Sequence, residues 1–138
     1  MSLNGRCAIV TGAGRDIGRA CAVRLAEAGA RVALNYFASS AGAEEAVAEI
    51  KDAGGDAFAM QGDRTRAGDA QALAARAVET FGEIGVLVNN AGGRIARKSM
   101  REMSLDHWTA VMDLNLTSTF HMIKACLPHI TTGAIVNI

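Results

Sequence analysis

Residues 11–18 have the sequence Thr-Gly-Ala-Gly-Arg-Asp-Ile-Gly, and this glycine-rich segment constrains the fold more than any other. It follows the apolar run at residues 7–10 and leads into residues 17–28, where apolar side chains recur at helical spacing. A strand, a glycine turn and a helix in this order leave unpaired backbone N–H groups at the positive end of a helix dipole. Glycines let a phosphate approach that backbone closely. The segment therefore predicts a site for the pyrophosphate of a dinucleotide.

The composition is that of a packed globular domain rather than a disordered chain, because half of the 138 residues are hydrophobic and proline occurs once. Fourteen acidic and fourteen basic residues balance, which argues against nucleic acid or a membrane surface as a partner. No apolar run has the length of a membrane span, and no basic segment followed by an apolar one begins the chain. We expect a cytoplasmic protein with one domain over residues 1–138.

Three cysteines are widely spaced without a Cys-x-x-Cys pair, so we expect buried thiols in a reducing compartment: Cys7, Cys21 and Cys126. The three histidines all lie between residues 107 and 129, and no carboxylate joins them at ligand spacing. The sequence therefore predicts no metal site.

Short apolar runs alternate with longer segments of helical periodicity. The runs that we expect to be strands are residues 7–10, 31–34, 57–60, 84–88 and 134–138, and the expected helices are residues 17–28, 43–53, 69–81 and 105–127. Gly29 and Gly54 are expected to end the first two helices, and Ser104 to cap the last one. Strands that alternate with helices pair in parallel through right-handed crossovers. The pattern predicts a doubly wound, Rossmann-like α/β fold with five strands.

Each expected helix has an apolar stripe that we expect to face the core. The stripes are Ile17, Cys21, Leu25 and Ala28 in the first helix, Ala43, Ala46, Val47 and Ile50 in the second, Ala70, Leu73, Ala77 and Phe81 in the third, and Leu105, Trp108, Met112, Leu116, Phe120, Ile123 and Leu127 in the last.

Three motifs in register resemble a known family. They are the glycine turn, the Asn-Asn-Ala-Gly at residues 89–92, and the Asp-Leu-Asn-Leu at residues 113–116 with the strand that follows it. This combination is similar to the N-terminal half of short-chain dehydrogenase/reductases, close in style to 3-oxoacyl-(acyl-carrier-protein) reductases, and covers essentially the whole chain. The resemblance implies that the C-terminal part of the usual fold is absent.

The resemblance also implies an activity: hydride transfer between NADP(H) and a small carbonyl or alcohol substrate, with a 3-oxoacyl thioester as one option. The family uses a Tyr, a Lys and a Ser, which we expect beyond Ile138, because the one tyrosine here is Tyr36. The 138 residues alone are therefore expected to be inactive. The alternative is a non-catalytic dinucleotide-binding module. Long helices like residues 105–127 often pack between subunits in this family, so a homo-oligomer, a dimer or a tetramer, is also implied.

The turn fits the family pattern Thr-Gly-x-x-x-Gly-x-Gly with one departure, because Asp16 stands at the middle glycine. We expect Asp16 to point outward, where a carboxylate favours the helix dipole and does not repel phosphate. Tight packing of strand against helix would also favour the glycines. The residues expected to bind cofactor here are Gly12, Gly14, Arg15, Ile17 and Gly18.

The end of the second strand chooses between cofactors. An acid there would hold the ribose 2′-hydroxyl of NAD, whereas a nearby Arg suits the 2′-phosphate of NADP. Asn35 and Tyr36 occupy this place without an acid, and Arg15 is within reach. We expect NADP(H), with NAD(H) possible and Arg15 as a solvated loop residue in that case.

Asp63 follows the third strand, where the resemblance implies a hydrogen bond to the adenine amino group, assisted by the backbone of the next residue. That residue is Arg64, where the family usually has an apolar side chain, so the edge of the adenine pocket is expected to differ. The alternative for Asp63 is a cap for the following helix.

Small residues after the fourth strand, Ala91 and Gly92, are expected to admit the nicotinamide-side ribose. Asn89 belongs to the same motif and could instead pair with backbone groups of neighbouring strands. Asn115 interrupts a helix of core-like pattern, and a buried amide needs partners. The resemblance implies a catalytic role for Asn115, which opens the helix locally and fixes a water linked to the catalytic Lys. The alternative is an amide satisfied between helix and sheet.

Overall fold

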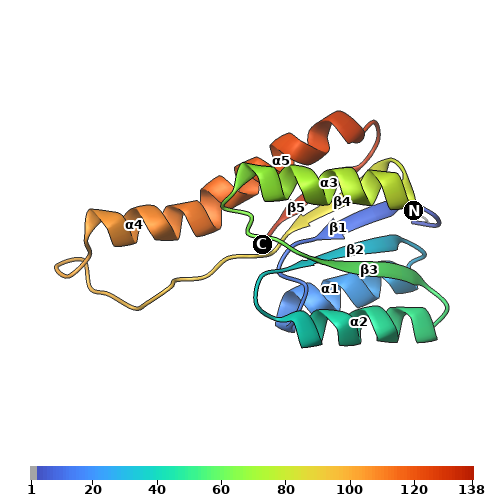
Figure 1. Cartoon of the computed structure of the whole chain (residues 1–138), viewed down its shortest axis with the longest axis horizontal. Coiled ribbons are helices and arrows are strands. Elements are labelled where there is room, and N and C mark those ends of the chain that lie inside the picture. Colours follow the sequence, from blue (N-terminus) through green and yellow to red (C-terminus); the bar gives the residue numbers. More distant parts are fainter. Residues whose placement is uncertain (1–2) are drawn as a thin grey trace.

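Five parallel strands form one sheet in the order β3-β2-β1-β4-β5. The computed structural model describes residues 3–138 and contains every strand that the sequence predicts (Figure 1). The strands are β1 (Cys7–Val10), β2 (Arg31–Tyr36), β3 (Asp56–Gln61), β4 (Ile84–Asn89) and β5 (Ala134–Asn137). This order confirms the doubly wound, Rossmann-like fold, since the chain runs outward from β1 in one direction and then returns to extend the sheet in the other.

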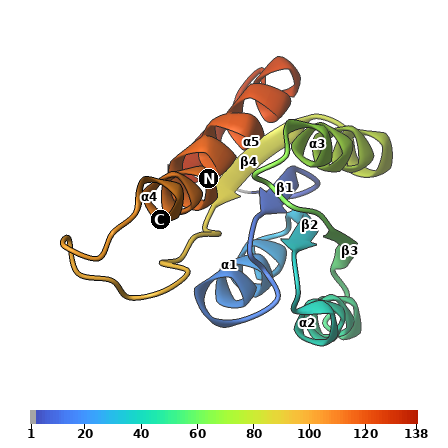
Figure 2. The same ribbon diagram turned by 60° about the vertical axis from the view of Figure 1, so that its left-hand side comes forward.

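Helices cover both faces of the sheet, as Figure 2 shows. One face carries α1 (Asp16–Glu27) and α2 (Ser40–Asp52), and the other carries α3 (Ala67–Phe81) and α5 (Ser118–Cys126). Before α5 come α4 (Leu105–Met112) and the π-helical segment η1 (Asp113–Thr117), and a 3-10 turn, η2 (Leu127–His129), follows it. The helix α4 extends past the sheet, toward the left of Figure 1.

Strand alternation divides the core into two layers. Ile9 and Leu87 face α3 and α5 and pack with Leu73, whereas Val10 and Leu34 face α1 and α2. All of these side chains are buried. The short apolar strands thus bury both faces, except for β5, where Val136 is 45% exposed at the edge of the sheet.

The turn and cap residues behave as the sequence predicts. Gly29 and Gly54 follow α1 and α2 with φ of +94° and +85°, the left-handed conformation that ends helices. Ser104 caps α4, because its Oγ accepts a hydrogen bond from the backbone N of His107 at 3.1 Å. The apolar stripes of α2 and α3 are also confirmed, with Ala46, Ile50 and Leu73 among the buried residues.

The stripe predicted for α1 is wrong by about one residue. Its buried side chains are Gly18 and Ala22, whereas Ile17 is 57% exposed and Ala28 is also exposed. Small residues on the inner face let this helix lie close to the sheet. Hydrophobicity alone favours Ile17 for the core, but closeness of backbone to backbone selects glycine and alanine there.

The stripe predicted for residues 105–127 is also mostly exposed, with Leu105 at 77% and Leu116 at 60%. Only the α5 part lies over the sheet, and its buried side chains are Ser118, Met122 and Cys126, four residues apart. Because α4 projects beyond the sheet, its apolar residues meet no layer within residues 3–138. The predicted single helix is also interrupted by η1.

The thiols of Cys7 and Cys126 are buried, as predicted, and Cys21 is partly buried. Burial raises the pKa of Cys7 to about 11 and that of Cys126 to about 12, so both stay protonated at neutral pH. None of the helices within residues 3–138 has the length and hydropathy that a membrane crossing requires. One domain over residues 1–138 stays a prediction, and its first two residues lie outside the described part.

Leu73→Ala is expected to lower the free energy of unfolding by about 2–5 kcal/mol, because it opens a cavity in the layer between α3 and the sheet. Leu105→Ala removes the same atoms from a side chain that is 77% exposed and should change it by less than about 0.5 kcal/mol. Urea unfolding of both variants measures the difference. Similar losses would mean that α4 is packed in solution.

Candidate functional site

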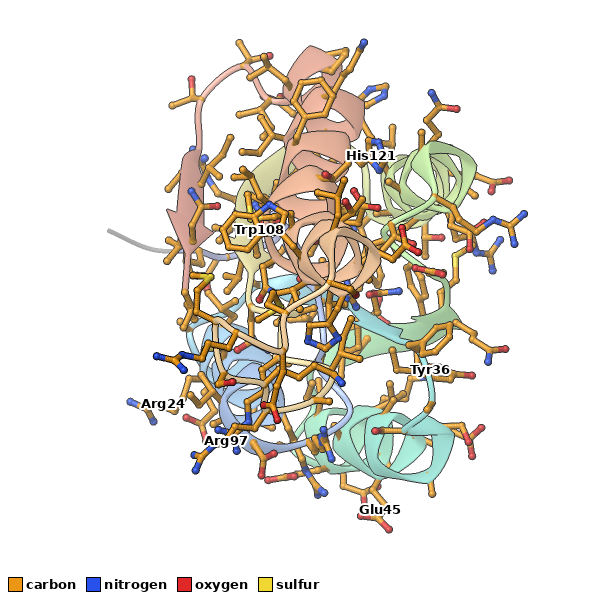
Figure 3. All side chains as sticks on the ribbon, turned by 90° about the vertical axis from the view of Figure 1, so that its left-hand side faces the viewer. Arg24, Tyr36, Glu45, Arg97, Trp108 and His121 are labelled. Carbon is orange, nitrogen blue, oxygen red and sulfur yellow. The ribbon has the colours of Figure 1, made fainter. Side chains whose placement is uncertain are left out.

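The largest cavity in the described part of the chain opens at the carboxyl ends of the strands, where β1 and β4 lie side by side. Its volume is about 590 Å³. Its walls come from the turn after β1, the ends of β2 and β3, the loop after β4, and one face of α4 and η1. Figure 3 looks onto this edge, with Tyr36 and Trp108 labelled. Ligands of open α/β sheets bind at such a reversal of strand order.

Most of the residues predicted to bind cofactor line this cavity. They are Gly12, Gly14, Arg15, Ile17, Tyr36, Asp63, Arg64, Ala91 and Gly92. Four predicted residues lie outside the wall: Gly18, Asn35, Asn89 and Asn115. Ile17 is exposed because it faces the cavity.

The glycines of the turn serve the packing as well as the cavity. Gly12 has a φ of +62°, and a Cβ on Gly18 would lie 2.2 Å from the carbonyl oxygen of Gly12. A Cβ on Gly14 would lie 2.6 Å from the carbonyl oxygen of Ser39, at the start of α2. Packing therefore requires glycine at 14 and 18, while Gly12 and Gly14 also present bare backbone to the cavity.

Asp16 has a φ of +48°, in the left-handed region that its family position normally fills with glycine. Asp tolerates this region better than most residues, at some cost. Its side chain is 82% exposed, and its Oδ2 lies 3.7 Å from Nε of Arg15, which is equally exposed. The expectation that Asp16 points outward is confirmed.

A hydrogen-bonded lock joins the turn after β1 to the loop after β4. The buried hydroxyl of Thr11 accepts hydrogen bonds from the backbone N of Asn90 and of Ala91, both at 3.1 Å. The side-chain Nδ2 of Asn90 donates back to the carbonyl oxygens of Thr11 at 3.1 Å and Gly12 at 3.2 Å. Asn90 was not among the predicted site residues, although the Asn-Asn pair contains the signal.

Asn35 is a buried support rather than a wall residue, so its prediction as a cofactor contact is wrong in this structure. Its Nδ2 donates to the carbonyl oxygens of Gly62 at 3.2 Å and Met60 at 3.4 Å. Its Oδ1 accepts from Nη1 of Arg64 at 3.3 Å. Alternation along β2 turns Asn35 toward the α3 layer, and the next residue, Tyr36, lines the cavity.

Asp63 lies in the cavity wall with a carboxylate that is ionised at neutral pH. Its Oδ1 accepts hydrogen bonds from the hydroxyl of Thr65 at 2.6 Å and its backbone N at 2.9 Å. These bonds, that of the hydroxyl foremost, lower the pKa of Asp63. Since Thr65 precedes α3, the carboxylate orders the loop rather than capping the first turn of the helix.

Asn89 joins two strands instead of facing the cavity. Its Nδ2 donates to Oδ1 of Asn137 at 2.9 Å, which links β4 to β5 by side chains and not through the backbone groups that we expected. Within residues 3–138 its buried Oδ1 has no hydrogen-bond partner.

Asn115 is exposed, so the expectation of a buried amide is wrong, yet its side chain is well partnered. Its Nδ2 donates to the carbonyl oxygens of Gly93 at 2.6 Å and Val111 at 2.7 Å, and its Oδ1 accepts from the N of Gly93 at 3.0 Å. It lies in η1, so the helix is opened at Asn115 as the resemblance implies. Its side chain therefore holds the loop after β4 against the opened helix.

Metal ligation finds no support in the described side chains, where three or more His, Cys, Asp or Glu never gather.

Gly18→Ala is expected to lower the free energy of unfolding by about 1–3 kcal/mol or more, because the new Cβ meets a backbone oxygen that cannot move away. Gly68→Ala is the matched control: it lies in α3 with nothing within 4 Å of its Cβ position, and the substitution should stabilise by about 0.4–1 kcal/mol. Thermal and urea unfolding of both variants measure these changes. A neutral Gly18→Ala variant would contradict the close packing of α1.

Comparison with known proteins finds the short chain dehydrogenase family over residues 6–138. The 3-oxoacyl-(acyl-carrier-protein) reductase of Staphylococcus aureus (strain Mu50) is 42% identical over 137 residues, which cover 96% of this chain and 55% of the relative. Glucose 1-dehydrogenase 2 of Bacillus subtilis is 40% identical over 127 residues, which cover 92% of this chain and 49% of the relative.

Among solved structures, a short chain dehydrogenase from Burkholderia cenocepacia in complex with NADP superposes with a TM-score of 0.93 at 36% identity. The match covers 99% of this chain and 56% of that one. The chain thus spans about half the length of the relatives that it matches. With the family matched over nearly every residue and the fold shared throughout, this chain belongs to the short chain dehydrogenase family.

Proposed function

We propose that this chain is the cofactor-binding half of an oxidoreductase that transfers a hydride between NADP(H) and the carbon of a small carbonyl or alcohol substrate. The observation that carries the proposal is the cavity of about 590 Å³ at the reversal of strand order, walled by the glycine turn and the ends of β2 and β3. A 3-oxoacyl thioester is the substrate class that we favour, because relatives that share about two fifths of the sequence include such a reductase.

The first turn of α1 fits a pyrophosphate. No side chain caps this helix at Arg15, so the N–H groups of its first turn are left for a ligand. Gly12 and Gly14 give the cavity a floor of bare backbone that a Cβ would fill. Anions are stabilised at such a helix N-terminus by the N–H groups and by the dipole.

The end of β2 favours a ribose that carries a phosphate. Tyr36 and Ser39 line the cavity there with hydroxyl groups, and no residue between 35 and 40 is acidic. The guanidinium of Arg15 lies in the same wall and is 80% exposed, so it is free to move toward a phosphate, in competition with Asp16. We therefore favour NADP(H) over NAD(H), which remains the alternative.

When bound, the nicotinamide supplies the hydride at its C4, and the residues of this chain orient it. The carboxylate of Asp63 accepts a hydrogen bond from the amino group of the base. The amide of Asn115 fixes the loop that contains Gly92 and Gly93, next to the nicotinamide end, and we assign it a catalytic role through a bound water. The one tyrosine, Tyr36, lies in the dinucleotide wall, so we assign proton transfer to residues outside these 138.

A homo-oligomer completes the proposal. Large apolar side chains along α4, η1 and α5 are about half exposed or more: Leu105, Trp108, Leu116, Phe120 and Leu127. Such a stripe on long helices is suited to packing against a second copy.

Fluorescence titration tests the proposed function directly. The 138-residue chain should bind NADPH saturably and should not oxidise it with an acetoacetyl thioester, whereas a longer native form that includes a Tyr-x-x-x-Lys segment should do both. Binding without turnover in that longer form would favour the alternative of a non-catalytic module. Failure to bind either NADPH or NADH would contradict the proposal.

Arg15→Ala should weaken NADPH binding by about three- to tenfold and leave NADH binding nearly unchanged, because it removes an exposed phosphate contact. Arg24→Ala is the matched control, since Arg24 is as exposed, lies on α1 and faces away from the cavity. Isothermal titration with both cofactors gives the two ratios. Equal losses for NADPH and NADH would count against a phosphate contact.

A further inference from the structure

Arg64 buries a positive charge in the cavity wall with almost no compensation. Only 7% of the residue is exposed, and burial lowers its pKa from the usual value, although a guanidinium remains charged. Within residues 3–138 the guanidinium makes one hydrogen bond, from Nη1 to Oδ1 of Asn35, while Nε is sealed from solvent without a partner. No carboxylate of the described residues lies within ion-pair distance of it.

Two neighbours hold Arg64 in this position. Its carbonyl oxygen lies 3.1 Å from Nδ1 of His121, which projects from α5. Asn35, which holds the side chain, is itself tied to the carbonyls of Met60 and Gly62 at the end of β3. A buried and unpaired charge costs free energy, so a residue held in this way is arranged for a ligand rather than for stability.

The position of Arg64 selects one part of a dinucleotide. The pyrophosphate belongs at the N-terminus of α1 and the ribose at the end of β2. The wall beyond β2, made by Asp63, Arg64 and Leu114, then faces the base. Asn35 directs Arg64 toward the α3 layer, on the other side of β2 from Tyr36, so its charge lies away from the expected 2′-phosphate.

We propose that the Arg64 side chain contacts the base of the bound dinucleotide and determines specificity for adenine. This inference rests on the proposed function. A guanidinium is planar and weakly hydrated, so it pairs with the face of an aromatic ring and donates hydrogen bonds in its own plane. With Asp63 as acceptor and Arg64 as donor, the wall matches the amino group and the ring nitrogen N1 of adenine. Hypoxanthine reverses both groups and presents an acceptor to Asp63 and a donor to Arg64.

Isothermal titration with 5′-ADP, 2′,5′-ADP and inosine 5′-diphosphate tests this assignment. The unchanged chain should prefer 5′-ADP over inosine 5′-diphosphate. Arg64→Leu should bind 5′-ADP about three- to thirtyfold more weakly and lose most of that preference, because it loses the cation and the donor. Its ratio of 2′,5′-ADP to 5′-ADP affinity should stay unchanged. Arg64→Lys keeps the charge without the planar donor, and should recover part of the affinity but not the preference.

Thermal unfolding without ligand separates this role from a structural one. Arg64→Leu should melt at a higher temperature than the unchanged chain, since an uncompensated buried charge is removed, even though it binds 5′-ADP more weakly. A lower melting temperature together with unchanged base preference would overturn the assignment. So would a loss of the 2′-phosphate ratio, which would move the contact from the base to the phosphate. If the unchanged chain binds NADPH and Arg64→Leu binds all three nucleotides equally well, this inference alone fails; if the unchanged chain binds no nucleotide, the proposed function fails with it.

Discussion

The contact between the carbonyl oxygen of Gly12 and the backbone of Gly18 governs the rest of the site. It brings α1 so close to the turn that no Cβ fits at Gly18, and it aims the first turn of this helix along the cavity floor. The amide of Asn90 then bonds the carbonyl oxygens of Thr11 and Gly12 and fixes the turn to the loop after β4. A ligand at this point meets backbone groups that are ordered before it arrives, so less conformational entropy is lost on binding.

The same closeness explains which predictions from the sequence succeeded. Periodicity identified every strand and the buried faces of α2 and α3, because those helices bury ordinary apolar side chains such as Ile50 and Leu73. It failed for α1, where Ile17 was expected in the core and Gly18 takes that place. A hydrophobic pattern measures apolar area and contains no information about how near two backbones must come. The glycine motif carries that information, although it was assigned to phosphate binding alone.

The polar residues of the site separate along a different line. Alternation along a strand decides whether a side chain lines the cavity or lies beneath it, and the sequence does not specify the parity at a strand end. Asn35 and Asn89 were expected at the cofactor and instead tie strands and loops together. Asn115 was expected to be buried, because the pattern of residues 105–127 is that of a core helix; that expectation failed where α4 leaves the sheet. What remained correct was its place at the opening of the helix, which came from the family resemblance and not from periodicity.

The cavity thus holds two arginines under opposite physical conditions. Arg15 is exposed beside Asp16, so solvent and a neighbouring carboxylate already stabilise its charge, and a ligand phosphate gains little beyond exchange of partners. Arg64 is buried with one hydrogen bond, and any ligand group that faces it removes part of an existing penalty. Binding free energy from Arg64 therefore has its origin in the ligand-free protein, which is destabilised by holding the charge. A site of this kind discriminates by geometry, because a planar cation in fixed contact with Asn35 cannot follow a misplaced base, whereas the mobile side chain of Arg15 can follow a misplaced phosphate.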